Sequence, residues 1–192
     1  MSDVLTIDTE AGILKEKKIE PLTVYSDDHP LLNKVMPKYT EELPNSDMYN
    51  LVKRMKHTMK LYGGIGLSAN QCGIEKRVFV MGTDNYQIAC INPKVLEVSK
   101  EVIKDTEGCL SFPAMFMKVE RPQSVLAEYT DENGEVHQEW FNGLTARCFL
   151  HETDHMNGIK YTEYVGPLAL KMAKQKQQKR IKTVKRKLKN VV

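Results

Sequence analysis

The stretch Leu144-Thr-Ala-Arg-Cys-Phe-Leu-His-Glu-Thr-Asp-His-Met-Asn-Gly158 places apolar and ionisable side chains on one predicted helix. The helix is expected to begin near Leu144 or Thr145 and to stop at Gly158, because glycine readily adopts the left-handed conformation that ends a helix. Its apolar members dominate, which is typical of a helix buried under a sheet rather than one lying at the surface. We therefore expect this helix at the centre of the fold.

Within it, His151-Glu-Thr-Asp-His155 has the pattern HExxH. Positions i and i+4 lie on one face of a helix, so both histidines can reach one divalent cation. Glu152 would then project beside the metal and take a proton from the attacking water instead of acting as a ligand. A solvated polar helix face can produce the same five residues by chance, so the pattern alone leaves that alternative open.

A catalytic metal needs three protein ligands and one open position, which leaves one ligand to find. Glu107-Gly-Cys-Leu-Ser-Phe-Pro113 puts Cys109 in a glycine-flanked extended segment, where backbone can approach a site closely. The alternative for Cys109 is a small buried apolar residue.

The rest of the chain predicts one more helix and several short strands around this centre. Ser46 offers an N-cap for an amphipathic helix that ends at Gly63-Gly64. Asn133-Gly134 predicts a hairpin that pairs residues 124–130 with residues 135–141. Further strands are expected at 78–81, 87–91, 95–98 and 102–103.

These elements predict an α+β fold in which short antiparallel β-sheets pack around the central HExxH-bearing helix, with an N-terminal amphipathic helix and a basic C-terminal helix. The chain has 192 residues, of which 41% are hydrophobic, as expected of one globular unit. We expect a flexible segment at 1–20, a catalytic domain at 21–165 and a basic helix at 166–192. The N-terminal residues lack the apolar segment of a signal peptide and no long apolar run follows, so we expect a cytoplasmic protein without membrane contact.

Charge is distributed unevenly along the chain. From Lys171 to Val192 there are ten lysines and arginines and no acid, whereas residues 1–170 carry 18 bases against 25 acids, a net charge of −7. A basic tail on an acidic body favours a polyanionic partner such as nucleic acid. A solvated terminal helix that keeps the chain soluble is the alternative. The tail is expected to carry a narrow apolar stripe made of Ile181, Val184, Leu188 and Val191.

Three motifs together resemble the signature motifs of peptide deformylases, in the same order: Gly64-Ile-Gly-Leu-Ser-Ala-Asn-Gln71, Glu107-Gly-Cys-Leu-Ser111 and His151-Glu-Thr-Asp-His155. The similarity extends from about Pro21 to Tyr164. It implies hydrolysis of the N-formyl group from the formyl-methionine of newly synthesised polypeptides, with release of formate. It also implies one divalent metal ion, Fe²⁺ in the cell, with Zn²⁺, Ni²⁺ or Co²⁺ able to replace it in purified protein.

The resemblance implies a role for individual residues. Cys109, His151 and His155 would bind the metal, Glu152 would act as base and then acid, and Gln71 with the Leu110 backbone N–H would bind the oxyanion. The methionine side chain would occupy a slot formed by Ile65, Leu144 and Cys148, with Arg147 at its rim, and Ile65 and Gly66 would pair with the peptide backbone. Plain core packing is the alternative for Leu144 and Cys148.

The sequence departs from the family pattern at two positions, and the resemblance also implies one supporting contact. Ser68 stands where the family often has alanine, a change expected to be neutral. Leu150 stands where glutamine is usual, which removes a polar side chain that can buttress the site. Asp154 and Arg121 are expected to form an ion pair, with an isolated surface charge as the alternative for Asp154.

Two alternative functions remain open from the sequence. One is an HExxH zinc endopeptidase, which would need a third ligand downstream of the helix. The other is a non-catalytic module that binds the ribosome or RNA through its basic tail. If the tail instead docks a deformylase on the ribosome, deleting the residues after Lys171 should weaken ribosome binding and leave hydrolysis of a free peptide nearly unchanged.

Overall fold

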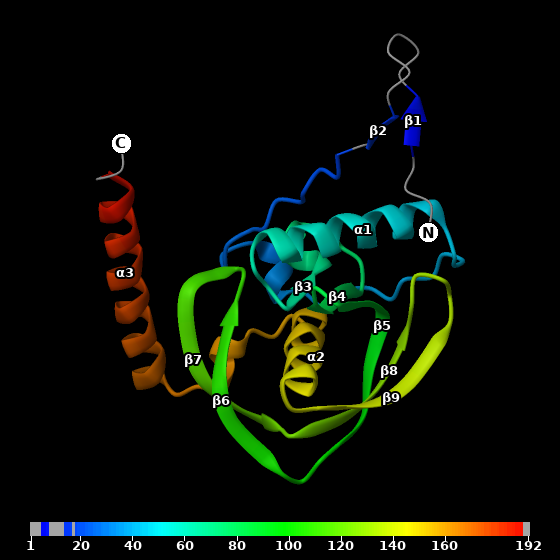
Figure 1. The fold of residues 1–192 in the computed structure, drawn as a ribbon. Helices are drawn as coiled ribbons and strands as arrows, with labels where there is room; N and C mark the ends of the chain where they lie inside the picture. The colour runs from blue at the N-terminus through cyan, green and yellow to red at the C-terminus, as the bar shows by residue number, and fades with distance from the viewer. Residues whose placement is uncertain (1–4, 8–13, 17, 190–192) are drawn as a thin grey trace.

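The computed structural model describes residues 5–7, 14–16 and 18–189, and the side chains of residues 18–187 (Figure 1). The expected flexibility of residues 1–20 falls mostly on residues outside this part. Strands β1 (Leu5–Ile7) and β2 (Leu14–Glu16) pair with each other. Among the described helices, none combines the length and the apolar character needed to cross a membrane.

The larger sheet is antiparallel, with its strands in the order β3-β4-β5-β8-β9. The strands are β3 (Gly66–Ser68), β4 (Val78–Thr83), β5 (Tyr86–Val98), β8 (Ser124–Thr130) and β9 (Val136–Asn142). Helix α1 (Ser46–Leu61) and helix α2 (Gly143–Met156) lie on opposite sides of β3 and β4 (Figure 1).

Alternation along β4 explains this three-layer arrangement. Val78 and Val80 pack in the same core cluster as α1, whereas Phe79 and Met81 pack in the cluster that contains α2. Successive side chains of a strand point to opposite faces, so a strand covered on both faces is apolar at every position. In β8 only alternate residues, such as Val125 and Ala127, are buried, because one face of that strand is covered.

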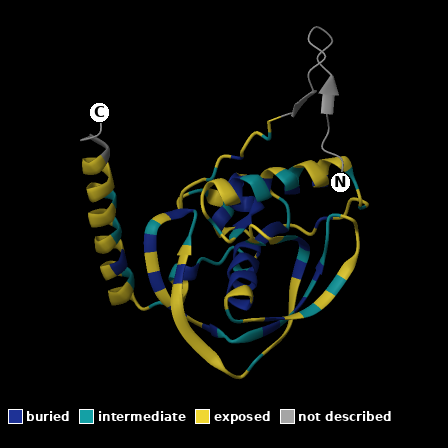
Figure 2. Cartoon of the chain, viewed as in Figure 1, coloured by how far each residue is buried: buried dark blue, intermediate teal, exposed yellow. Residues whose placement is uncertain are grey.

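Helix α2 is the most deeply buried of the described helices (Figure 2). Ten of its 14 residues are buried, and they include the ionisable side chains of His151, Glu152 and His155. Apolar contacts of Phe149 with Phe79 and Phe141 fix the helix against the sheet. The sheet and α2 together therefore position the HExxH residues in the interior.

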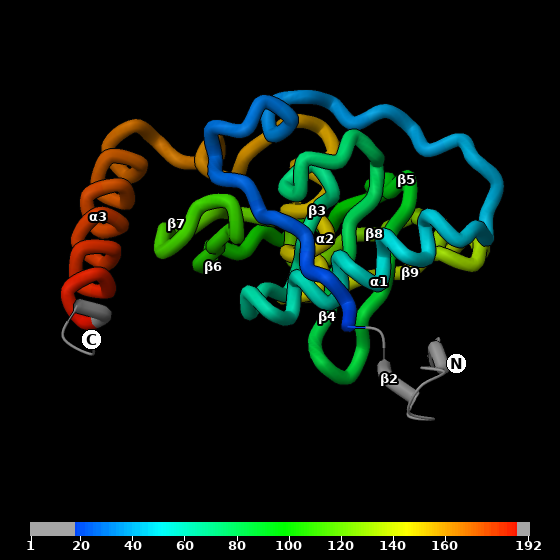
Figure 3. The backbone as a smooth tube through the Cα atoms, turned by 90° about the horizontal axis from the view of Figure 1, so that it is seen from above, coloured from blue at the N-terminus to red at the C-terminus, as the bar shows by residue number. Residues whose placement is uncertain are grey.

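A second, two-stranded sheet closes the other side of α2. It is the hairpin of β6 (Val102–Cys109) and β7 (Phe112–Pro122). Helix α3 (Pro167–Lys189) lies alongside β7 in both views (Figures 1 and 3). Three short 3-10 helices complete the described elements: η1 (Pro30–Asn33), η2 (Ala69–Cys72) and η3 (Tyr161–Tyr164).

The α+β class with antiparallel sheets is confirmed, and so is the predicted hairpin. Its second strand is 136–142, one residue later than the expected 135–141, because Thr130 pairs with Val136 across the turn. Other details differ from expectation. Asn45, not Ser46, caps α1, because its side-chain oxygen accepts the Met48 N–H at 2.8 Å. Residues 87–91 and 95–98 form one strand, β5, interrupted by register shifts.

Strand β7 was not predicted, and the apolar stripe of α3 is displaced. In β7 buried residues alternate with exposed ones, but Pro113 and the positive φ of Ala114 obscure its start. On α3 the side facing β7 carries Ala173, which is buried, whereas Val184 is exposed. Val191 and the side chain of Leu188 lie outside the described part of the chain.

Candidate metal and hydrolysis site

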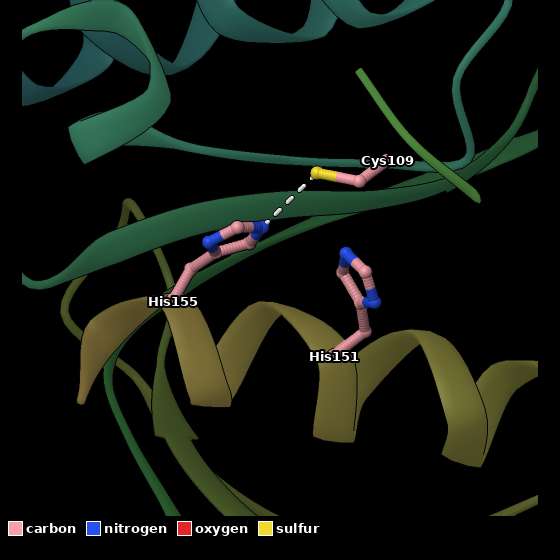
Figure 4. Close-up of side chains that lie close together, drawn as sticks. All are labelled: Cys109, His151 and His155. Atoms are coloured by element: carbon pink, nitrogen blue, oxygen red, sulfur yellow. Dashed lines mark hydrogen bonds between the residues drawn. The ribbon is translucent and has the colours of Figure 1, made fainter. Parts of the chain in front are cut away.

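Three predicted ligands meet at the buried face of α2. Cys109, the last residue of β6, lies with its Sγ 3.3 Å from Nε2 of His155. The rings of His151 and His155 both rise from α2 toward this thiol (Figure 4). One donor atom from each of the three residues lies within 4.8 Å of the others. A helix and a strand edge that are distant in the sequence therefore bring two imidazoles and one thiol together.

Glu107, two residues before Cys109, organises the charges behind this cluster. Its carboxylate accepts hydrogen bonds from Arg121 at 2.7 and 3.0 Å and from Arg147 at 2.7 Å. It also lies 3.0 Å from Nδ1 of His151, which leaves Nε2 of that ring for the cluster. Burial would raise the pKa of Glu107, but the contacts with His151 and Arg121 outweigh it and lower the pKa to about 2.

This donor set fits a divalent cation. Burial would lower the pKa of His151, but hydrogen bonds to Cys109 and Glu107 raise it to about 10, so the surroundings favour a positive charge there. Burial, and then the charge of His151, hold the pKa of His155 well below its usual value, which favours the neutral ring that binds metals. A thiol and two imidazoles are ligands suited to zinc or iron.

Glu152 lies on the same face of α2, with its carboxylate against β3. The Ser68 hydroxyl donates a hydrogen bond to Oε2 of this carboxylate. At Gly66 an added Cβ would lie 2.3 Å from Oε1 of Glu152, so the carboxylate occupies the space that a side chain would fill. Burial raises the pKa of Glu152, against the opposing effects of His151 and Ser68. Ser68 therefore makes a contact that alanine cannot make. The expectation that the replacement is neutral for the enzyme stays a prediction.

Gln71 also reaches the cluster, from η2. Its Oε1 accepts the Ser68 backbone N–H at 2.9 Å, so its NH₂ group points away from Ser68. That amide donates to Sγ of Cys109 at 3.3 Å and to the Ser111 hydroxyl at 3.2 Å. Gln71 is 1% exposed, so its N–H groups are held in the interior beside the predicted ligands.

A cavity of about 490 Å³ opens onto this group of residues. Its lining includes Gln71, Cys109, His151 and Glu152 together with all of the residues predicted for the methionine slot. The slot residues found in the lining are Ile65, Leu144, Arg147 and Cys148. Gly66, predicted to pair with the peptide backbone, and Leu110, a predicted oxyanion donor, line it as well.

Arg147 differs from its expected place at the rim of the slot. It is buried, and besides Glu107 its guanidinium donates to the carbonyl oxygens of Val119 and Ile103. Its charge is therefore used to join α2 to the β6–β7 hairpin. Leu144, at 61% exposed, lies at the mouth of the cavity instead.

The remaining predicted positions have clear contacts. Arg121 donates to Asp154 at 2.6 Å, so the expected ion pair is present. Leu150 packs in the apolar cluster of α2 and the sheet. The side chain of Leu110 lies over Gly64, where an added Cβ would come within 2.9 Å of it.

The roles of Glu107, Ser68 and Ser111 were not predicted from the sequence. Each lies inside or beside a quoted motif, and that position was the available signal. What each side chain contacts depends on which strands meet, because their partners are between 14 and 84 residues away along the chain.

The described residues include a second group with metal-ligand side chains: Asp131 and Glu135 in the β8–β9 turn, and His137 at the start of β9. There the Asp131 carboxylate accepts the backbone N–H groups of Asn133 and Glu135, both at 2.9 Å. Its function in holding the turn accounts for its position.

Comparisons with known proteins agree with this geometry. The family model described as "Polypeptide deformylase" matches residues 21–171. A peptide deformylase of Thermotoga maritima is 38% identical over 153 residues, which cover 80% of this chain and 90% of that protein.

Two solved structures are also similar. A peptide deformylase of Synechococcus elongatus in complex with actinonin superposes with a TM-score of 0.78 at 32% identity, covering 82% of this chain and 88% of that one. A Met-Ala-Ser-bound peptide deformylase of Acinetobacter baumannii gives a TM-score of 0.73 at 31% identity, covering 77% and 100%. This chain therefore belongs to the peptide deformylase family, the enzymes that remove the formyl group from the N-terminal formyl-methionine of newly synthesised polypeptides.

Proposed function

We propose that this chain deformylates formyl-methionyl peptides with Cys109, His151 and His155 as metal ligands, Glu152 as proton carrier, and Gln71 with the Leu110 backbone N–H as oxyanion donors. The observation that supports this most strongly is the convergence of the three ligand atoms within 4.8 Å. Two of the three, Cys109 and His151, line the cavity together with Glu152 and Gln71. When bound there, a divalent metal would polarise the formyl oxygen and make water more acidic.

Glu152 would move the proton. Water attacks the formyl carbon, Glu152 accepts a proton from that water, and the same carboxyl returns it to the departing amine nitrogen, so formate and a free amino terminus leave. Burial raises the pKa of Glu152, which brings its affinity for a proton closer to that needed for both steps. A carboxylate held against β3 can carry out both transfers without leaving its place.

Gln71 would stabilise the oxygen that becomes negative as water attacks. Its Oε1 is held by Ser68, so its N–H groups point toward Cys109 and the cavity. A fixed donor of this kind typically contributes about 3 kcal/mol of transition-state stabilisation. Leu110 follows Cys109 directly and also lines the cavity, which supports its backbone N–H as the second donor.

The methionine side chain would enter the cavity beside Ile65, Leu144 and Cys148. The Acinetobacter baumannii relative is known with Met-Ala-Ser bound, which supports a peptide of this kind as the ligand of the corresponding cavity here. Backbone of Ile65 and Gly66, at the start of the outermost strand β3, can pair with an extended peptide. A cytoplasmic location is proposed with this substrate, because such chains are made there.

The direct test is formate release from formyl-Met-Ala-Ser by wild type and by Glu152→Gln. We expect release by wild type, and a loss of at least about 100-fold in kcat for the variant with its metal content unchanged, because the proton carrier is absent. Full activity of metal-loaded Glu152→Gln would disprove the assignment. Casein is the control substrate, and its cleavage would support the endopeptidase alternative instead.

The bound metal is proposed to be Fe²⁺. A thiolate and two imidazoles suit iron and zinc alike, so ligand type does not separate them. Metal analysis of protein purified without oxygen should find iron, and exposure to air should abolish activity through loss of iron or oxidation of Cys109. Zinc in anaerobically purified, fully active protein would reject iron.

The basic surface of α3 is proposed to bind the ribosome. Lys179, Lys182 and Lys185 are exposed on this helix, and binding to phosphates would depend on salt. Changing all three to glutamine should weaken co-sedimentation with ribosomes, most clearly at low salt, while formate release from a free peptide stays the same. Equal ribosome affinity of the variant and the wild type would reject this surface. These substitutions are a sharper test than truncation, because they leave the contacts of α3 with β7 intact.

A further inference from the structure

Strand β3 presents two of its three residues to α2. Gly66 and Ser68 are two apart, so they face the same side of the strand, and both contact Glu152. Leu67, between them, packs on the opposite side in the cluster that contains α1. On the face of β3 that meets Glu152, Gly66 therefore leaves space for the carboxylate and Ser68 provides one hydroxyl.

Ser68 contacts both side chains that the proposed chemistry uses. Its backbone N–H donates to Oε1 of Gln71 at 2.9 Å, and its hydroxyl donates to Oε2 of Glu152. The Glu152 carbonyl oxygen is a weaker second acceptor at 3.4 Å. Ser68 is completely buried, so water cannot replace the hydroxyl without a rearrangement of the core.

The Glu152 carboxylate has no other hydrogen-bond partner among residues 18–187. Its other oxygen lies over Gly66, which limits where the carboxylate can go but offers no side-chain donor. A buried carboxylate oxygen without a donor loses the stabilisation of a charge-assisted hydrogen bond and turns more freely.

We propose that Ser68 is a positioning residue of the reaction, whose hydroxyl holds the Glu152 carboxylate while its backbone N–H holds the Gln71 amide. This rests on the proposed roles of Glu152 and Gln71. The two functions are separable, because substitution of the side chain removes the hydroxyl and keeps the N–H. The hydroxyl should therefore matter for the proton transfers and much less for peptide binding.

The test compares kcat, KM, metal content and melting temperature of Ser68→Ala and Ser68→Thr with the wild type. For Ser68→Ala we expect kcat to fall about tenfold, the size of one hydrogen bond to a charged group, with KM and metal content unchanged. Ser68→Thr keeps the hydroxyl and should recover most of kcat. Thr58→Val is the matched control, because it removes another buried hydroxyl. On α1 the Thr58 hydroxyl accepts the Leu22 backbone N–H and donates to the Arg54 carbonyl oxygen. This variant should lower the melting temperature without changing kcat.

A double-mutant cycle decides whether Ser68 acts through Glu152. In Glu152→Asp the carboxylate is one methylene shorter and loses the contact with β3, so adding Ser68→Ala should reduce kcat no further. Unchanged kcat in Ser68→Ala would overturn the proposal. So would an equal relative decrease in kcat when Ser68→Ala is added to wild type and to Glu152→Asp, which is the result expected if the substitution damages the fold in general. Failure of the proposed function is seen separately, as a wild type that releases no formate.

Discussion

Gly66 shows how a missing side chain can shape the proposed catalytic site. Because an added Cβ would lie 2.3 Å from Oε1 of Glu152 and 2.9 Å from Sγ of Cys148, Gly66→Ala must displace the carboxylate. Misplacement of a catalytic group by about 1 Å costs on the order of 100-fold in rate. We expect that loss in kcat for formate release. Gly166→Ala is the control, since a Cβ there meets nothing within 4 Å, and an equal loss in both variants would contradict the explanation.

Glu107 balances two buried arginines. Glu107→Gln would leave Arg121 and Arg147 without their shared counter-charge, and breaking a buried pair in this way typically costs about 3–5 kcal/mol. We expect the free energy of unfolding, measured with urea, to fall by about 3 kcal/mol. Glu120→Gln breaks only an exposed pair with Lys104 and should change it by about 0.5 kcal/mol or less. Similar losses in both variants would show that burial of the pair is unimportant.

Acid should remove the stabilisation that Glu107 provides. Its pKa is about 2 in the folded protein and near 4.5 in the unfolded chain, so the unfolded state binds the proton first as the pH falls. The contribution of about 3 kcal/mol is complete above pH 4.5 and declines toward pH 2. The difference in unfolding free energy between wild type and Glu107→Gln should therefore shrink over this range. A constant difference from pH 7 to pH 2 would contradict the lowered pKa.

At the scale of elements, α3 supports one wall of the cavity. Gln177 and Arg180 donate, each at 3.0 Å, to the carbonyl oxygens of Pro113 and Ala114, and both acceptors line the cavity. The Arg180 guanidinium also lies over the ring of Phe116, another lining residue. A basic helix that looked like an appendage in the sequence therefore contacts the wall of the cavity proposed to bind the peptide.

Truncation after Lys171 should consequently affect the enzyme itself. It removes the buried Ala173 as well as the contacts of Gln177 and Arg180, so we expect a loss of about 1–2 kcal/mol in stability and a higher KM for formyl-Met-Ala-Ser. This replaces the expectation that hydrolysis stays nearly unchanged. Thermal unfolding and steady-state kinetics measure both effects, with the three-lysine variant of α3 as control. If the truncated protein kept the wild-type KM, the cavity wall would not depend on its contacts with α3.

At the scale of the whole molecule, the proposed metal joins two parts of the fold. Cys109 belongs to the β6–β7 hairpin, whereas His151 and His155 belong to the helix packed on the larger sheet. Binding at 100 times Kd would stabilise the folded state by about 2.7 kcal/mol. A cation held by all three residues would thus link hairpin and helix.

Metal removal should therefore loosen one part more than the other. After chelation we expect a lower melting temperature and faster amide hydrogen exchange in β6 and β7, with smaller changes in β4 and β5. Added Zn²⁺ or Co²⁺ should reverse both effects in wild type and fail to do so in Cys109→Ser. Uniform acceleration of exchange across both sheets would argue against a link at Cys109.

Local patterns in the sequence determined much of this molecule. Helical periodicity identified α1, and an apolar stretch that stops at Gly158 identified α2. Asn133-Gly134 identified the β8–β9 hairpin, and three ordered motifs identified the family. Each signal depends on residues close together in the chain or on a short motif, which is why the sequence alone was sufficient. Strand β7 was missed because Pro113 and Ala114 interrupt its alternation.

Tertiary structure decided which side chains face one another. Ser68 contacts Glu152, Glu107 joins Arg121 and Arg147, and α3 reaches the cavity wall, although none of these pairs has a local sequence signature. Hydrogen bonds act over about 3 Å, so their existence depends on how strands and helices far apart in the chain are packed. The sequence by itself determined the family, the predicted ligands and most of the elements, but not β7. Packing of β3 and the β6–β7 hairpin on α2 decided how the carboxylate, the amide and the cavity are held around them.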